Sequence, residues 1–368
     1  MADVWKLDDY HKLLQAELVA ALTARNDPDL DPEELIEETY RGLIPKIADQ
    51  LYSAFDDGSK AMLHEHRSLR RGFVTRNKAR WRGGFDLLER LIVISEETGS
   101  AINNALRPKA VETNDPVFEA VISNHARAIQ TAREILTLMI AGFPDGAMGR
   151  WRTLHEIAVV SFFISKAGSA TAERYILHDR VVAYRRAKNY MDHHKRANLG
   201  PIEQSTLDAL KAAHDEVLRA HGPEMKQDYG WALGAVPGSR PTFAQLEEAL
   251  GLDHWRPRYK WATTNTHGSY RSLNSTLATS ESEAPVLAVG ESNSGMTDPA
   301  HMTAIALNTA TYPVIALEPN LDRLAVFEVM SRLSDEIGET FLRLDRESYA
   351  RARKRRGTGR RAASVRAE

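Results

Sequence analysis

Apolar residues recur at steps of three and four positions along most of this chain, whereas strict alternation of apolar and polar residues is nearly missing. Steps of three and four place side chains on one face of an α-helix, and alternation places them on one face of a strand. The two clearest helical stripes are Phe118, Val121, Ile122, Ala128, Ile129, Ala132, Ile135, Leu136, Met139 and Ile140, and then Val326, Met330, Leu333, Ile337, Phe341 and Leu344. We therefore expect an all-α fold, a multi-helix globular bundle.

Helix-start and helix-stop signals divide the chain. Asp31-Pro32 and Asp115-Pro116 each place an N-cap residue before a proline at the first helical position. Thr242 and Gln245 have the spacing of a capping box. Clusters of glycine and proline separate about eight to ten helices, with a less regular region at roughly 222–300. Residues 285–289 are the one candidate for a strand, so we expect at most one short strand or hairpin.

The chain of 368 residues is long enough for two domains, or for one large helical domain with attachments. We expect an N-terminal helical region over residues 1–110, a central and C-terminal helical domain over 111–345, and a tail over 346–368. The tail contains nine Arg or Lys and two Glu. It is either a solvated, disordered end or an arm that binds the phosphates of RNA or DNA. The arm would consist of Arg351, Arg353, Lys354, Arg355, Arg356, Arg360 and Arg361.

The composition excludes several kinds of site. The chain has no cysteine, so disulfides, thiolate metal sites and cysteine nucleophiles are impossible. The segments 64–66 (His-Glu-His) and 192–194 (Asp-His-His) contain metal-ligating residue types, but immediate neighbours on a helix do not face one ion. The usual phosphate-loop, dinucleotide-binding and metalloprotease motifs are missing. We expect no metal and no cofactor.

The cellular setting follows from the same composition. The first residues form neither a basic leader nor an apolar signal segment. The apolar runs are short, whereas a membrane span needs about 20 apolar residues. The excess of arginine over lysine and the abundance of alanine indicate a bacterial genome rich in G and C. We expect a soluble, cytoplasmic protein without membrane contact. A homodimer is a further expectation, although no strict heptad seam requires one.

The most informative segment is 149–166, whose second half is apolar on nearly every side and predicts a helix through the middle of the fold. Arg152 and Glu156 are four residues apart, which is close enough to pair. They lie in line with Val160 and Phe163 rather than on a polar face. Charges on such a helix are costly to bury unless they are paired and hydrogen-bonded. The pair is therefore either a structural salt bridge or the floor of a polar pocket.

Two histidines complete the candidate site. His178 falls in one row with Tyr175 and Val182 and should face inward, either as a satisfied core residue or as a functional one. His267 lies among Thr and Ser residues in the run 259–271 and could act as an acid or a base near neutral pH. The alternative for this run is a polar helix start. We treat Arg152, Glu156, His178 and His267 as one shared catalytic candidate.

The order of Arg152-x-x-x-Glu156, His178 and the Thr-x-His-Gly-Ser run resembles a bacterial family, domain of unknown function 5677, over roughly residues 115–280. That family in turn resembles the HEPN helical domains, many of which are ribonucleases. The second resemblance implies an Arg-x(4–6)-His motif, in which arginine stabilises phosphate charge and histidine transfers a proton. Arg150–His155 and Arg186–His193 fit this spacing, and random placement of these residue types would also produce such matches.

Two function classes follow. In the first, the protein is a non-enzymatic interaction or ligand-sensing module of a bacterial stress or defence system. In the second, it is a metal-independent HEPN-like ribonuclease or toxin that acts on RNA, with Arg152 and Glu156 as positioning residues and His178 or His267 as the proton-transferring group. We prefer the first class because no motif exceeds its chance frequency, and we leave open whether the chain is an enzyme.

Overall fold

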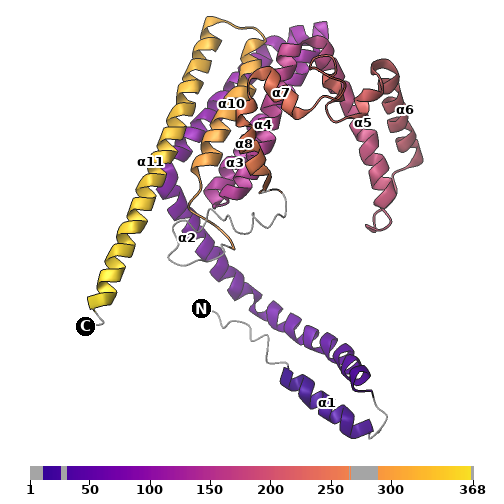
Figure 1. The fold of residues 1–368 in the computed structure, drawn as a ribbon, viewed down its shortest axis with the longest axis vertical. Helices are drawn as coiled ribbons and strands as arrows, with labels where there is room; N and C mark the ends of the chain where they lie inside the picture. Colours follow the sequence, from indigo (N-terminus) through magenta and orange to yellow (C-terminus); the bar gives the residue numbers. More distant parts are fainter. Residues whose placement is uncertain (1–10, 26–30, 265, 267–288, 366–368) are drawn as a thin grey trace. The chain divides into compact units, whose positions relative to one another are not determined.

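A computed structural model describes residues 11–25, 31–264, 266 and 289–365 (Figure 1). In these residues the protein consists of ten α-helices and three short 3-10 helices, without a strand. The all-α prediction is confirmed. Of the predicted strand at 285–289, all but the last residue lies outside the described part of the chain.

The chain divides into two compact units, an N-terminal unit (Met1–Thr75) and a main unit (Arg76–Glu368). The N-terminal unit contains α1 (His11–Arg25) and the first part of the long helix α2 (Pro32–Thr113). Helix α2 beyond Thr75 contributes large apolar side chains, among them Trp81, to the core of the main unit. The domain bounds expected from the sequence, 1–110 and 111–345, stay a prediction.

The main unit is a bundle around α4. Its other elements follow α2 in chain order: α3 (Pro116–Ala141), α4 (Pro144–Ala167), α5 (Ser169–His193), α6 (Gln204–His221), η1 (Pro223–Lys226), η2 (Gly230–Ala232), α7 (Phe243–Leu250), η3 (Asp253–Trp255), α8 (Arg256–Thr264), α10 (Thr297–Ala316) and α11 (Leu321–Val365). Helix α4 packs against α3, α5, α7, α8 and α10, and α11 packs along α10 (Figure 1). The helix predicted to run through the middle of the fold therefore does so.

The local signals that predicted helix starts are present as hydrogen bonds. The carboxylate of Asp115 accepts from the backbone N–H groups of Val117 and Phe118, at 2.9 and 3.2 Å, and so caps α3. Thr242 and Gln245 form the capping box of α7. The loop between α3 and α4 turns at Gly142, whose φ of 90° is a conformation that favours glycine. These features fix where α3 begins and ends and where α7 begins.

Helix α11 continues to Val365 and thus includes residues 346–365 of the basic tail. Of the residues proposed for a nucleic-acid arm, Arg351 has a described side chain, which pairs with Glu347 at 3.2 Å. Nucleic-acid binding by this segment stays a prediction. None of the helices in the described ranges combines the length and the apolar composition that a membrane span requires.

A small polar cluster lies inside the bundle, between α2, α3 and α10. The ring nitrogen Nε2 of His125 is 3.2 Å from the hydroxyl of Ser95 and 3.3 Å from that of Thr311. The imidazole fits there because Gly99 has no side chain, and a Cβ at that position would collide with the ring. Burial lowers the pKa of His125 to about 4, so the folded protein holds this ring neutral at physiological pH.

This buried histidine makes stability depend on pH. The pKa is depressed in the folded state, so its contribution is complete above the unfolded value of 6.5 and is lost as pH falls towards 4. We expect the free energy of unfolding to fall by up to about 3 kcal/mol over that range on account of this residue, at about 1.4 kcal/mol per pKa unit. Urea unfolding of the native chain and of His125→Asn at several pH values measures the difference. Parallel pH dependences of the two proteins would contradict this assignment.

Candidate functional site

The central helix α4 carries two charged residues into the middle of the bundle. Arg152 Nη2 lies 3.0 Å from Glu156 Oε1, so the ion pair expected from their spacing is present. The side chains on the adjoining faces of α4, such as Trp151 and Leu154, are buried. Each member of the pair nevertheless keeps about a third of its side chain exposed, at 31% and 33%. The pair therefore forms a polar spot that solvent can reach on an otherwise apolar helix.

Tyr259 of α8 completes this pair. Its hydroxyl accepts a hydrogen bond from Arg152 Nη2 at 2.6 Å and donates one to Glu156. The guanidinium carbon of Arg152 also lies 4.7 Å from the centre of the tyrosine ring, within reach of a cation–π interaction. Burial, together with the hydrogen bond to Glu156 and its charge, raises the pKa of Tyr259. The phenol thus stays protonated and donates to the carboxylate.

A second polar layer lies beneath the first. Glu247 of α7 is fully buried, and its two carboxylate oxygens have different partners. Oε1 is 2.9 Å from Nε2 of His155, and Oε2 forms an ion pair with Arg256 at the start of α8. A buried carboxylate is tolerated when it is paired and hydrogen-bonded in this way. These contacts hold α7 and α8 against α4 and so position Tyr259.

Aromatic rings enclose the two layers. The ring of His155 contacts those of Trp151, Phe243 and Tyr259, with centroids 5.3 to 6.0 Å apart. Tyr229 lies 6.0 Å from Phe243, and burial, followed by the negative charges of Glu156 and Asp228, raises its pKa. We call the set Arg152, His155, Glu156, Tyr229, Glu247, Arg256 and Tyr259 the Arg152 cluster.

Two nitrogen atoms of the Arg152 cluster lack partners. Nε of Arg152 and Nε of Arg256 are buried and have no hydrogen-bond partner among the described residues. A buried N–H group without a partner costs about 1–3 kcal/mol. The unused donor of Arg152 belongs to the side chain that pairs with Glu156, and that of Arg256 to the side chain that pairs with Glu247.

His178 makes its hydrogen bond to a residue outside the Arg152 cluster. Nε2 of His178 lies 2.9 Å from the carbonyl of Gln227. Because a carbonyl only accepts, Nε2 carries the proton. Burial lowers the pKa of this histidine. Nearby, Arg174 donates to the carbonyls of Gly230 and Leu233 at 2.8 and 3.2 Å. His178 and Arg174 therefore hold the η1–η2 segment against α5.

His267, the fourth candidate, lies outside the described residues. The preceding residue, Thr266, is described and lies close to α4, since a Cβ added to Gly149 would be 3.3 Å from its methyl group.

The two Arg-x(4–6)-His matches have other partners. In the first match, Arg150 pairs with Glu134 and His155 pairs with Glu247. In the second match, Arg186–His193, the Nδ1 atom of His193 is 3.0 Å from the carbonyl oxygen of Asn189. In the described part of the chain, no group of three His, Asp or Glu side chains could hold a metal ion.

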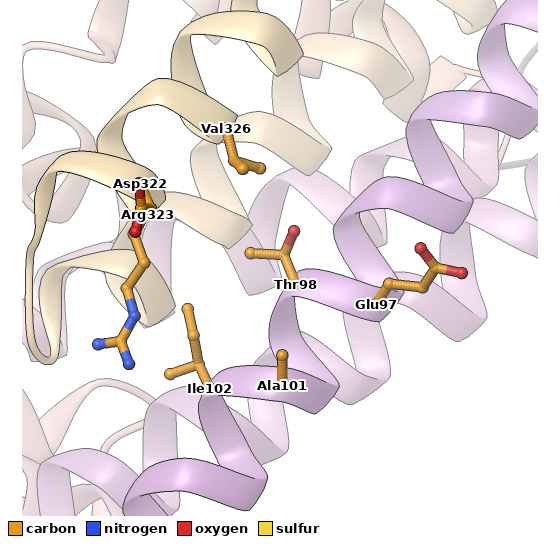
Figure 2. A pocket seen from close by; sticks show the side chains of 7 residues that line it. All are labelled: Glu97, Thr98, Ala101, Ile102, Asp322, Arg323 and Val326. Carbon is orange, nitrogen blue, oxygen red and sulfur yellow. The ribbon is translucent and has the colours of Figure 1, made fainter.

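A pocket of about 350 Å³ lies elsewhere in the main unit, between α2 and the start of α11 (Figure 2). Thr98, Ile102 and Val326 line it, and Glu97 points away from its centre (Figure 2). Its cation, Arg323, lies 3.5 Å from Glu318 and is thus already paired. With few converging polar groups, this pocket is a weaker candidate than the Arg152 cluster.

Comparison with known proteins is consistent with the resemblance seen in the sequence. Residues 118–284 match the model of a family of unknown function (DUF5677). This range includes every residue of the Arg152 cluster. No curated protein and no solved structure matches the chain.

The contribution of the buried Glu247 carboxylate to the free energy of unfolding can be measured. We expect Glu247→Gln to lower the free energy of unfolding by about 3 kcal/mol, since the partly buried Arg256 then lacks the charge that balances it. The matched control is Glu248→Gln, at the next, exposed position of α7, which should change stability by less than about 0.5 kcal/mol. Chemical denaturation measures both. Equal effects of the two substitutions would contradict the buried role of Glu247.

Proposed function

We propose that the protein is a ligand-binding helical module and that the Arg152 cluster is its binding site. The main support is that Arg152 and Glu156, which Tyr259 bridges, are both partly exposed, while the Nε–H group of Arg152 is buried without a partner among the described residues. An ion pair that serves packing alone is usually satisfied by its neighbours. The part of the Arg152 side chain that solvent reaches is where an anionic ligand oxygen would bind.

The chemistry of the cluster indicates the class of ligand. Arginine is well suited to carboxylate and phosphate oxygens, because its planar head donates several hydrogen bonds in fixed directions. Glu156 accepts hydrogen bonds, so the ligand should carry an N–H or O–H donor near its anionic group. The rings of Tyr229 and Tyr259 favour a planar portion. Nucleoside monophosphates have all of these features, and small amino acids have the anionic group and the adjacent donor.

A metal-independent ribonuclease is the rival function, and it needs a histidine that can exchange protons beside Arg152. His155 is committed to Glu247, and His178 to the carbonyl of Gln227. These contacts favour binding over catalysis by the described histidines. His267 stays the residue through which the rival function would act. A ligand-sensing role in a bacterial stress or defence system agrees with the binding proposal.

Calorimetric titration tests the proposal. The purified full chain is titrated with glutamate, glutamine and the four ribonucleoside monophosphates, and we expect at least one to bind. Arg152→Met should weaken that binding at least about tenfold, which is about 1.4 kcal/mol. The control is Arg150→Met on the same helix, whose side chain pairs with Glu134 and should leave binding unchanged.

Three results would overturn the proposal. The first is that none of these probes binds the native chain. The second is that Arg150→Met and Arg152→Met weaken binding equally while both proteins remain folded by circular dichroism. The third is that the chain cleaves a labelled RNA and that His267→Ala abolishes the cleavage, which would establish the ribonuclease instead.

A further inference from the structure

The N-terminal unit has little apolar core of its own. In its described residues, 11–25 and 31–75, the buried apolar side chains are Leu35 and Leu43, which are 3% and 6% exposed. Helix α1 covers the face of α2 that carries Leu35 and Thr39, where Glu17 and Ala21 lie opposite them. Two buried side chains are far fewer than a small helical unit needs for stability by itself.

A different face of α2 presents an exposed apolar stripe. Ile36, Tyr40, Ile44, Met62 and Leu69 are each at least 41% exposed. At about 100° of rotation per residue, these side chains fall within one sector about 80° wide. The stripe is about 50 Å long, since a helix rises about 1.5 Å per residue. Ile47 and Leu51, which are partly buried, fall in the same sector between Ile44 and Met62, whereas Tyr52, Phe55 and Leu63 are exposed outside it. A long, narrow apolar sector of this kind has the shape of a helix–helix seam.

The stripe is symmetric about its middle. Ile36 and Leu69 lie at nearly equal distances from residue 53, and so do Ile44 and Met62. If a second copy of the helix ran in the opposite direction, Ile36 would lie opposite Leu69, and Ile44 opposite Met62. Such a two-fold arrangement uses the same surface on both partners.

Charge favours the same arrangement. Residues 31–57 contain eight Asp or Glu and two Arg or Lys, whereas residues 58–75 contain four Arg or Lys and one Glu. An antiparallel pair places the acidic half of each helix beside the basic half of the other, and a parallel pair places like charges together. Glu34 and Glu37 lie beside the stripe on the same side of the helix as His66 and Arg70. In an antiparallel pair, this side of one helix lies next to the same side of the other. The acidic half is a poor match for an anionic membrane surface.

We propose that the segment Ile36–Leu69 of α2 pairs antiparallel with the same segment of a second copy of this chain. The resulting homodimer covers the stripe and supplies the apolar core that the N-terminal unit lacks. The interface is isologous, with its two-fold axis near residue 53. It is independent of the Arg152 cluster, which lies in the main unit.

Two neighbouring residues give a matched test of the interface. Met62 and Leu63 are both 41% exposed, but Met62 lies on the stripe and Leu63 lies about 100° away around the helix. We expect the full chain to sediment as a dimer at micromolar concentrations, Met62→Glu as a monomer, and Leu63→Glu as a dimer. A monomeric native chain, or equal behaviour of the two variants, would overturn the proposal.

The absence of cysteine allows the direction of pairing to be tested. Ile36→Cys and Leu69→Cys variants of the full chain are mixed and oxidised. The antiparallel register brings the two different variants within disulfide distance, so a mixed dimer should be the main cross-linked product. A preference for Ile36→Cys dimers with themselves would show parallel pairing and contradict the proposal. Binding to vesicles of anionic lipid without cross-linking would identify a membrane surface as the occupant instead.

Discussion

The cost of placing charges inside an apolar bundle is the constraint on which the main unit depends. Helix α4 packs against five other helices and still carries Arg152, His155 and Glu156. Charged groups in such a place need partners, because the interior does not solvate them as water does. Helices α7 and α8 supply those partners. The position of both helices on α4 is therefore set by hydrogen bonds and ion pairs as well as by apolar contact.

The two layers of the cluster have different consequences. The lower layer is closed: Glu247 is fully buried and bonds to both His155 and Arg256. It fixes the geometry. The upper layer, Arg152 with Glu156 and Tyr259, is partly open and has an unused donor. In the proposed site, a closed and paired lower layer thus supports a polar group that solvent can reach.

Features set by neighbouring residues could be predicted from the sequence, and features set by distant residues could not. The helices, the caps at Asp115 and Thr242 and the Arg152–Glu156 pair all follow from spacings of two to four residues. Tyr259 meets Arg152 across 107 positions, and no local pattern shows that contact, although the run that begins at Tyr259 was singled out for His267. The same applies to the buried partner of His155 and to the contacts of His178, which depend on how the helices pack.

The ionisation of Tyr259 tests the construction of the Arg152 cluster most directly. The phenol lies between Arg152 and Glu156, and burial and the adjacent carboxylate raise its pKa above the ordinary value of 10. Ultraviolet difference absorbance of the native chain and of Tyr259→Phe, followed with increasing pH, isolates this one tyrosine among eleven. We predict that the two curves coincide up to the pH at which the protein unfolds. A tyrosine that ionises near pH 10 in the native chain and is missing from Tyr259→Phe would contradict it.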